Sequence, residues 1–190
     1  MELELLTDRL LLRPLRLDDL DVATEMFTDP EVTRYAGGVL TAEEVETEMS
    51  DYIKRCAGGG IGIWCVLDRE TSEKLGSGAL LPIPIEEKDT NWDLVEGPDL
   101  PDREIEVGYF LKRPAWGKGY ATEICMRLLA FAFEETPLVD VVACIEGDND
   151  RSRHVLSKSG LRDEGTRRAY AEQLPCFRVT RTQWMSANRS

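Results

Sequence analysis

The hydrophobic positions near the start of the chain alternate with polar ones and then change to a helical spacing. The segment LLLRPLRLDDLDVATEMF at 10–27 begins with the pattern of a strand. Its later apolar residues, from Leu20 to Phe27, recur every three or four positions and so share one face of a helix. This part of the chain therefore predicts a strand and then a helix that begins at Asp18 or Asp19.

A second helix is predicted where Thr41 and Glu44 form a capping-box pattern, in which each residue can bond to the other's backbone. Apolar residues then recur at helical spacing from Val45 to Cys56. Three glycines at 58–60 follow and favour the end of the helix. We expect this helix to extend from Thr41 to Cys56.

Strand patterns dominate the middle of the chain. Four strands are predicted, at 61–68, 74–83, 103–111 and 138–146. The last of these is almost wholly apolar, which is typical of a strand buried on both faces. Residues 84–102 are acidic, contain several prolines and show no periodicity, so they predict a long loop. Loops of that length inside compact domains are often functional.

Two further helices and a hairpin are expected in the second half. A complete apolar stripe predicts the first helix and consists of Ala121, Ile124, Cys125, Leu128, Leu129 and Ala132. The second helix is capped by Asp148 or Asn149 and stopped by Gly160. Strand-like runs at 161–170 and 175–184 resemble a closing hairpin. With no internal repeat or linker, residues 1–190 are expected to form one mixed α/β domain.

Composition narrows the class of protein. The longest apolar runs, at 61–67 and 128–133, are much shorter than the roughly 20 residues that a membrane-spanning helix needs. The N-terminus has early acidic residues and no sustained apolar segment, so a cytoplasmic protein without a membrane partner is expected. Five cysteines form no CxxC pair and His154 is the single histidine, so no metal site is predicted. His154 itself is expected at the surface, and Trp64 in the core.

The formal net charge of −13 changes the expected partners. An acidic surface repels phosphate backbones, which argues against direct binding of nucleic acid. It attracts cations, and an amine is the simplest cationic substrate. The alternative is that the acidic residues serve only solubility.

A glycine-rich turn lies between the strand at 103–111 and the helix that follows it. Backbone N–H groups at such a junction, with the positive end of the helix dipole behind them, favour a phosphate or pyrophosphate. Lys118 is followed by Gly119, whereas a Walker loop needs Ser or Thr there. Thr122 stands where a dinucleotide-binding loop needs its third glycine. From spacing alone, a purely structural turn is an equal alternative.

Two segments carry a specific family resemblance: EVGYFLKRPAWGKGYATE at 106–123 and EGDNDRSRHVLSKSGLRDEGTRR at 146–168. Together with the opening residues 5–38, they resemble the GNAT superfamily of acetyl-CoA-dependent N-acetyltransferases, and within it the RimJ/RimL-like branch of protein N-terminal acetyltransferases. The likeness extends from about residue 5 to about residue 184. It implies a mixed, mostly antiparallel sheet that is splayed between the strands near 105–111 and 139–146 and flanked by helices.

The resemblance implies that acetyl-CoA is the cosubstrate and that no metal is needed. The pyrophosphate is expected on the amides of residues 117–122, and the pantetheine arm beside the 105–111 strand, much like an added strand. Asn149 matches a family position that contacts the pantetheine, and it also suits a helix N-cap. The expected cofactor-binding residues are Val107, Tyr109, Leu111, Trp116, Gly117, Lys118, Gly119, Tyr120, Ala121, Thr122, Asn149 and Ser152.

The resemblance also suggests a direct transfer to a primary amine, without a covalent intermediate. Glu106 matches the family's glutamate and is the expected base, although its alternation with Glu104 also fits two solvated surface residues. A strand N–H near Val107 or Gly108 is expected to meet the oxyanion, and Ser152 to protonate the leaving thiolate. Leu156 occupies the place where many members carry the tyrosine that acts as this acid.

The acceptor is predicted less specifically. Tyr35 and Trp92 are candidates for lining its cleft. A protein N-terminal α-amine is the preferred substrate, and an amino sugar, a polyamine or an antibiotic is the alternative within the class. A CoA-binding module without turnover is a further alternative, because Leu156 replaces the tyrosine and Arg178 replaces a common acidic residue. Either a monomer or a homodimer fits the sequence.

Overall fold

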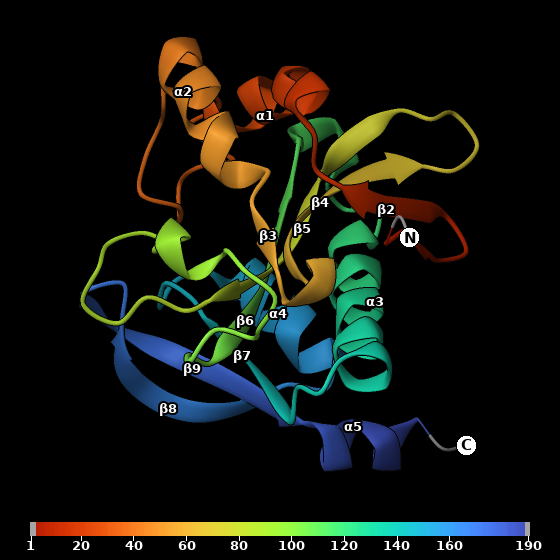
Figure 1. The fold of residues 1–190 in the computed structure, drawn as a ribbon, viewed down its shortest axis with the longest axis vertical. Coiled ribbons are helices and arrows are strands. Elements are labelled where there is room, and N and C mark those ends of the chain that lie inside the picture. Colours follow the sequence, from red (N-terminus) through yellow and green to blue (C-terminus); the bar gives the residue numbers. More distant parts are fainter. Residues whose placement is uncertain (1–2, 189–190) are drawn as a thin grey trace.

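A mixed sheet of nine strands runs through the described residues of the chain, and helices cover both of its faces (Figure 1). The computed structural model describes residues 3–188. The strands follow the order β1-β2-β4-β5-β6-β7-β9-β8, with β3 paired to β4. All neighbouring strands in this sheet are antiparallel except β6 and β7, which are parallel. The mixed α/β class and the mostly antiparallel sheet that the sequence predicts are confirmed.

The elements have the following bounds. The strands are β1 (Leu5–Leu6), β2 (Leu10–Pro14), β3 (Arg55–Cys56), β4 (Ile61–Asp68), β5 (Lys74–Pro82), β6 (Ile105–Leu111), β7 (Asp140–Cys144), β8 (Arg162–Ala169) and β9 (Glu172–Thr180). The α-helices are α1 (Leu20–Phe27), α2 (Ala42–Tyr52), α3 (Tyr120–Glu135), α4 (Asp150–Lys158) and α5 (Arg181–Ala187). Short 3₁₀ turns are η1 (Leu17–Asp19), η2 (Ala57–Gly59), η3 (Trp92–Leu94) and η4 (Arg113–Ala115).

The predicted capping residues begin their helices. The Thr41 hydroxyl accepts from the backbone N–H of Glu44, and the Glu44 carboxylate accepts from the Thr41 N–H at 2.7 Å. At the start of α4 it is Asn149, the second of two candidates, whose side chain accepts from the Ser152 N–H at 3.1 Å. Each cap satisfies amide groups that have no partner within the helix.

The second predicted helix is too long at its C-terminal end. It ends at Tyr52, because Arg55 and Cys56 form the short strand β3 opposite Gly62 and Ile61. Cys56 is still buried, as an apolar position should be, but it lies in the sheet. Its position fits both patterns, so periodicity alone cannot separate them.

The final predicted strand is also too long. Strand β9 stops at Thr180, whose hydroxyl caps the unpredicted helix α5 by accepting from the Gln183 N–H. Gln183 in turn accepts from the Thr180 N–H at 2.9 Å. This second capping box places four of the expected strand residues in a helix.

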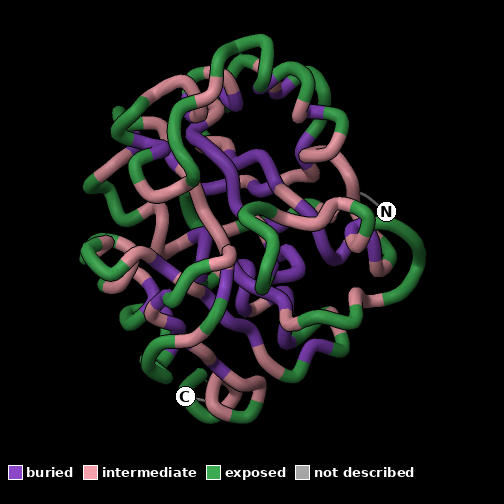
Figure 2. The backbone as a smooth tube through the Cα atoms, turned by 90° about the vertical axis from the view of Figure 1, so that its left-hand side faces the viewer, coloured by how far each residue is buried: buried purple, intermediate pink, exposed green. Residues whose placement is uncertain are grey.

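The two faces of the sheet have separate cores. On β4, Trp64 packs toward α3, where its ring meets Phe131, whereas Cys65 packs toward α1 and α2. Trp64 is fully buried and His154 is exposed, as predicted. Figure 2 shows buried residues along the central strands and exposed residues in the connections. None of the helices described between residues 3 and 188 is long and apolar enough to cross a membrane.

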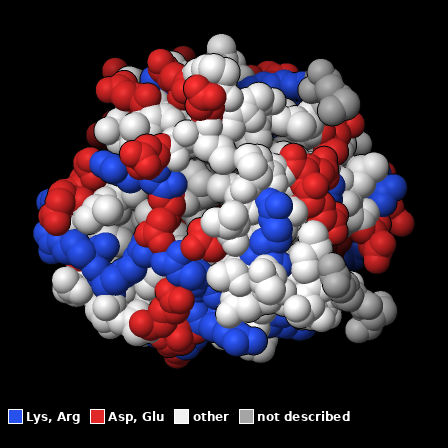
Figure 3. All heavy atoms as spheres, turned by 60° about the horizontal axis from the view of Figure 1, so that its bottom comes forward, with Lys and Arg blue, Asp and Glu red and all other residues white. Residues whose placement is uncertain are grey.

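Strands β6 and β7 diverge immediately beside their point of contact. Glu106 and Val142 form the pair that joins them. The Arg178 guanidinium on β9 bridges the same region: it contacts Asp140 of β7 at 2.5 Å, Glu104 beside β6 at 2.5 Å and Glu164 of β8 at 2.8 Å. In Figure 3, basic side chains form a band interleaved with acidic ones over the end of the molecule that holds β8 and β9.

Replacing Arg178 with leucine should lower the free energy of unfolding by about 2 kcal/mol, because three carboxylates lose their shared cation. The expected loss is below that for a fully buried pair because the side chains of Arg178 and Glu104 are 20% and 37% exposed. Chemical denaturation measures it. As the control, Arg168→Leu removes a more exposed arginine paired with Glu86 and should cost less than about 0.5 kcal/mol. Equal losses would mean that Arg178 does not hold the strands together.

Candidate active site

Glu106 is a buried carboxylic acid at the point where β6 and β7 separate. Only 9% of the residue is exposed. Its carboxyl accepts a hydrogen bond from the Tyr170 hydroxyl, and the backbone of Cys144 on β7 also bonds to it. Burial disfavours the charged form and raises the pKa of Glu106 to about 8. The alternative of two solvated glutamates is wrong, because Glu104 is held by Arg167 and Arg178 and Glu106 is buried.

Other charges around Glu106 come from three elements. Cys176 of β9 and Asp89 of the 84–102 loop further raise its pKa, and Arg167 of β8 lowers it. Asp89 also raises the pKa of Glu48 on α2. The long predicted loop therefore contributes negative charge near the buried carboxyl of Glu106, and the same charge also acts on helix α2.

The opposite face of β6 carries a second polar pair. The Tyr109 hydroxyl lies 2.8 Å from Ser152 Oγ on α4, within hydrogen-bond distance. Burial raises the pKa of Tyr109, so the phenol stays protonated at neutral pH. Val107 and Leu111 are buried on this same face, as strand alternation requires. Glu106 and Ser152 thus flank β6 from its two sides.

The glycine-rich turn after β6 has the backbone that its sequence predicts. Gly117 and Gly119 both lie in the left-handed region, with φ of +74° and +82°. Gly119 is the N-cap of α3, and the amides in the first turn of such a helix have no partner within it. A Cβ at Gly117 would meet nothing within 4 Å, so open space lies against this turn. The turn therefore fits an anionic group such as a pyrophosphate.

Side chains brace the turn from both directions. The Trp116 indole donates to the Leu111 carbonyl at 2.7 Å, and the Arg151 guanidinium of α4 lies 4.9 Å from the centre of its ring. Arg9, which the sequence analysis did not single out, donates to the Lys118 carbonyl at 2.9 Å and pairs with Glu123 of α3. Nothing in the local sequence around Arg9 indicates this contact, because it spans 109 residues.

Tyr35 and Trp92 lie in different surroundings. The Tyr35 hydroxyl donates to the Asp148 carbonyl at 3.3 Å, so the segment after α1 reaches the residue before the α4 cap. Trp92 packs its ring 5.6 Å from that of Tyr52 on α2 and is partly buried against the core. Their predicted role at the acceptor stays a prediction.

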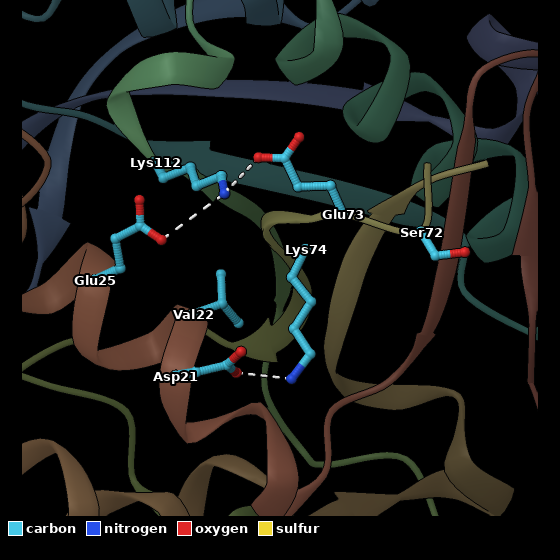
Figure 4. Close-up of a pocket in the computed structure, with 7 residues that line it drawn as sticks. All are labelled: Asp21, Val22, Glu25, Ser72, Glu73, Lys74 and Lys112. Atoms are coloured by element: carbon cyan, nitrogen blue, oxygen red, sulfur yellow. Dashed lines mark hydrogen bonds and ion pairs between the residues drawn. The ribbon is translucent and has the colours of Figure 1, made fainter. Parts of the chain in front are cut away.

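A hollow of about 320 Å³ lies away from these groups, between α1 and the turn from β4 to β5 (Figure 4). Lys74 and Lys112 point into it, but Asp21 and Glu73 hold them at 2.7 Å each. Lys112 lies six residues beyond Glu106 in the sequence, roughly 20 Å along an extended chain. None of the predicted site residues lines this hollow.

The buried carboxyl should make stability depend on pH. Below pH 4.5 Glu106 is neutral in the folded and unfolded chain, between 4.5 and about 8 it ionises only in the unfolded chain, and above 8 it ionises in both. The raised pKa therefore gives stability that is full below 4.5 and is lost as pH rises through 8, by about 1.4 kcal/mol per unit. Glu106→Gln stays neutral and should show no such loss in urea unfolding.

Glu104→Gln is the matched control for this measurement. The arginines lower the pKa of Glu104, so its charge stabilises the fold above the ordinary pKa, and its removal should destabilise the protein at neutral pH. If the stabilities of wild type and Glu106→Gln differed by a constant amount between pH 4.5 and 8, Glu106 would not have the raised pKa.

Comparisons with known proteins point to one protein family. A family model described as an acetyltransferase (GNAT) domain matches residues 9–162. The uncharacterized protein YkkB of Bacillus subtilis (strain 168) is 28% identical over 177 residues, which cover 92% of this chain and 94% of that protein. The putative ribosomal N-acetyltransferase YdaF of the same organism is 37% identical over 70 residues, covering 37% of this chain and 38% of YdaF.

A solved structure shows the same fold. The spermidine N-acetyltransferase from Vibrio cholerae, in complex with CoA and spermine, superposes with a TM-score of 0.70 at 16% sequence identity, covering 94% of this chain and 99% of that one. The expectation of an acetyltransferase is confirmed at the level of the family. Since the family model covers most of the sequence, the chain belongs to the GNAT acetyltransferase family and is an acyl-CoA-dependent N-acetyltransferase.

Proposed function

We propose that the protein transfers the acetyl group of acetyl-CoA directly to a protein N-terminal α-amine, and that residues 1–190 act as one domain. The burial of Glu106, which leaves 9% of the residue exposed and raises its pKa to about 8, is the observation that carries this choice of acceptor. The pKa of an α-ammonium group is about 7.7, so little free energy is needed to move its proton to such a carboxylate. The pKa of a lysine side chain is about 10.4, so the same proton transfer requires more free energy.

Acetyl-CoA supplies the activated acetyl group. The left-handed glycines and the first-turn amides of α3 suit its pyrophosphate, with the amides of residues 117–122 as donors. Strand β6 pairs with β7 at Glu106, so the rest of its edge there can pair with the amide groups of the pantetheine arm. Asn149 and Ser152, joined by the α4 cap, face the arm from the other side of the opening.

The roles of the remaining groups follow from their positions. Glu106 accepts the proton of the incoming amine, directly or through one water. A β6 backbone N–H near Val107 or Gly108 stabilises the negative charge that develops on the acetyl oxygen. Ser152 passes a proton to the departing sulfur as its hydroxyl takes up the second proton that the amine nitrogen loses, and Tyr109, to which it is hydrogen-bonded, holds that hydroxyl in place.

The relatives support more than one acceptor. YdaF is named as a putative ribosomal N-acetyltransferase, which supports the RimJ/RimL-like branch and a protein substrate. The Vibrio cholerae structure is of a spermidine N-acetyltransferase, which supports a small amine as the second candidate. The third alternative, a CoA-binding module, loses one of its two reasons, because Arg178 has a structural role in holding three strands.

Thiol release from acetyl-CoA tests the proposal. The panel contains a peptide with a free N-terminus and no lysine, the same peptide with a blocked N-terminus and one internal lysine, a polyamine and an amino sugar. We expect rapid release with the first peptide, and mass spectrometry should place the acetyl group on its α-nitrogen. Thiol release only with the polyamine or the amino sugar would favour a small amine as the acceptor. No release at all, with acetyl-CoA still bound by calorimetry, would overturn both kinds of acceptor and point to an amine of another class.

Replacing Gly119 with valine should weaken acetyl-CoA binding by about 10- to 100-fold, because a β-branched residue cannot keep φ at +82° and the amides leave their positions. Calorimetry measures the affinity. Gly165→Val is the matched control, since Gly165 has φ of +84° and open space but lies on β8. If both variants bind acetyl-CoA like the wild type, the turn after β6 is not the pyrophosphate site.

A further inference from the structure

The hairpin that joins β8 to β9 has an unusual turn. Its two central residues, Tyr170 and Ala171, have φ of +53° and +60°. These values belong to the tight hairpin turn for which Asn-Gly and Asp-Gly are the usual residues. A bulky residue such as tyrosine is disfavoured there, and a conformation of this kind persists only where the surroundings enforce it.

Two backbone hydrogen bonds hold this turn in place. The N–H of Tyr170 donates to the Pro84 carbonyl at 3.1 Å, and the N–H of Ala171 donates to the Ile85 carbonyl at 2.9 Å. Arg168 of β8 adds an ion pair to Glu86 at 2.8 Å. The tip of the hairpin is therefore fastened to the first residues of the 84–102 loop, and the tyrosine has little freedom to move.

The fastened turn aims one functional group at the buried carboxyl. Tyr170 is only partly buried and packs against a small apolar cluster that includes Ile83, Val142 and Leu174. Its hydroxyl donates to Oε1 of Glu106, which lies 64 residues earlier in the sequence. In the sheet, β7 lies between β6, which carries Glu106, and β9, which begins two residues after Tyr170. An apolar side chain would fill the cluster equally well without reaching the carboxyl.

We propose that Tyr170 is a positioning residue: its hydroxyl fixes Oε1 of Glu106, so that the other carboxylate oxygen is left for the proton of the amine. The proposal rests on the proposed function, in which Glu106 is the base. A donor to a carboxylate favours its ionised form, so the phenol also keeps the base from becoming too weakly ionised in its buried surroundings. The other titratable groups near the carboxyl are Cys144, Cys176, Arg167 and Asp89.

Tyr170→Phe removes the hydroxyl and keeps the ring. We expect kcat/KM for the accepted amine to fall about 10- to 100-fold, as for the loss of a hydrogen bond to a charged group. The pKa of the rising limb of the pH–rate profile should increase by about one unit. A tyrosine with a purely packing role would leave the position of this limb unchanged.

Ala171→Gly is the control for the turn. Glycine adopts φ of +60° without strain, so this variant relaxes the turn and keeps the hydroxyl. Its pH–rate profile should match that of the wild type. If it instead shifts as Tyr170→Phe does, the turn geometry and not the hydroxyl controls the reaction, and the proposal is wrong.

A measurement without turnover separates this proposal from the proposed function. Carboxyl ¹³C NMR titration of the whole protein, with the Glu106 signal assigned by its absence in Glu106→Gln, reports the pKa directly. Tyr170→Phe should raise it by about one unit whether or not the correct amine is known. An unchanged carboxyl pKa overturns the role of Tyr170. A raised pKa in a protein whose thiol release is insensitive to Glu106→Gln would uphold the contact and overturn Glu106 as the base.

Discussion

The contact between β6 and β7 is the constraint on which the site depends. The two strands are parallel and pair at Glu106 and Val142, whereas β5 pairs with β6 along the whole length of β6. Parallel strands that separate leave backbone donors and acceptors without a strand partner on their facing edges, and such groups must be satisfied in another way. An extended ligand with amide groups can supply these missing hydrogen bonds. The pantetheine arm of acetyl-CoA, the cosubstrate of the family, is such a ligand, so it fits the opening between the strands.

Strands that separate in this way need side-chain interactions, in addition to the hydrogen bonds of the sheet, to keep them in position. Arg178 supplies them from β9, because one planar cation bonds to carboxylates on or beside three other strands. The same region leaves Glu106 without enough water to ionise at its ordinary pKa. A network of charges and a buried acid that is hydrogen-bonded to Tyr170 and to the backbone of Cys144 thus lie side by side, and the folded protein gives up stability at neutral pH to keep that acid buried.

Sequence reasoning succeeds here where the signal is local. The bounds of β4 follow from a short apolar run that begins directly after three glycines, and the caps at Thr41 and Asn149 follow from side chains that bond within four residues. It fails where a residue fits two patterns, as Cys56 does, or where a strand changes into a helix at a cap inside the run, as at Thr180. The longer strands and helices are therefore predicted better than their ends, whereas the two-residue strands β1 and β3 and the short helix α5 are not predicted at all.

The candidate site divides in the same way. The glycine-rich turn can be predicted from the sequence, because a positive φ restricts which residues fit. Tyr170 is not, because its turn lacks the Asn-Gly or Asp-Gly signal and its partner is 64 residues away. Burial of Glu106 is equally hidden, since alternation shows which face a side chain takes and not what covers that face.

The attachment of the hairpin to residues 84 and 85 has an evolutionary consequence. Its two hydrogen bonds use only main-chain atoms, which any residues other than proline at 170 and 171 provide. Substitutions in the rest of the loop, as far as residue 102, leave these two bonds in place, but a change at Asp89 removes a negative charge that raises the pKa of Glu106, and a change at Glu86 removes the ion pair to Arg168. Substitutions in this loop can therefore change the charge around the acid during evolution without releasing the tyrosine that contacts it.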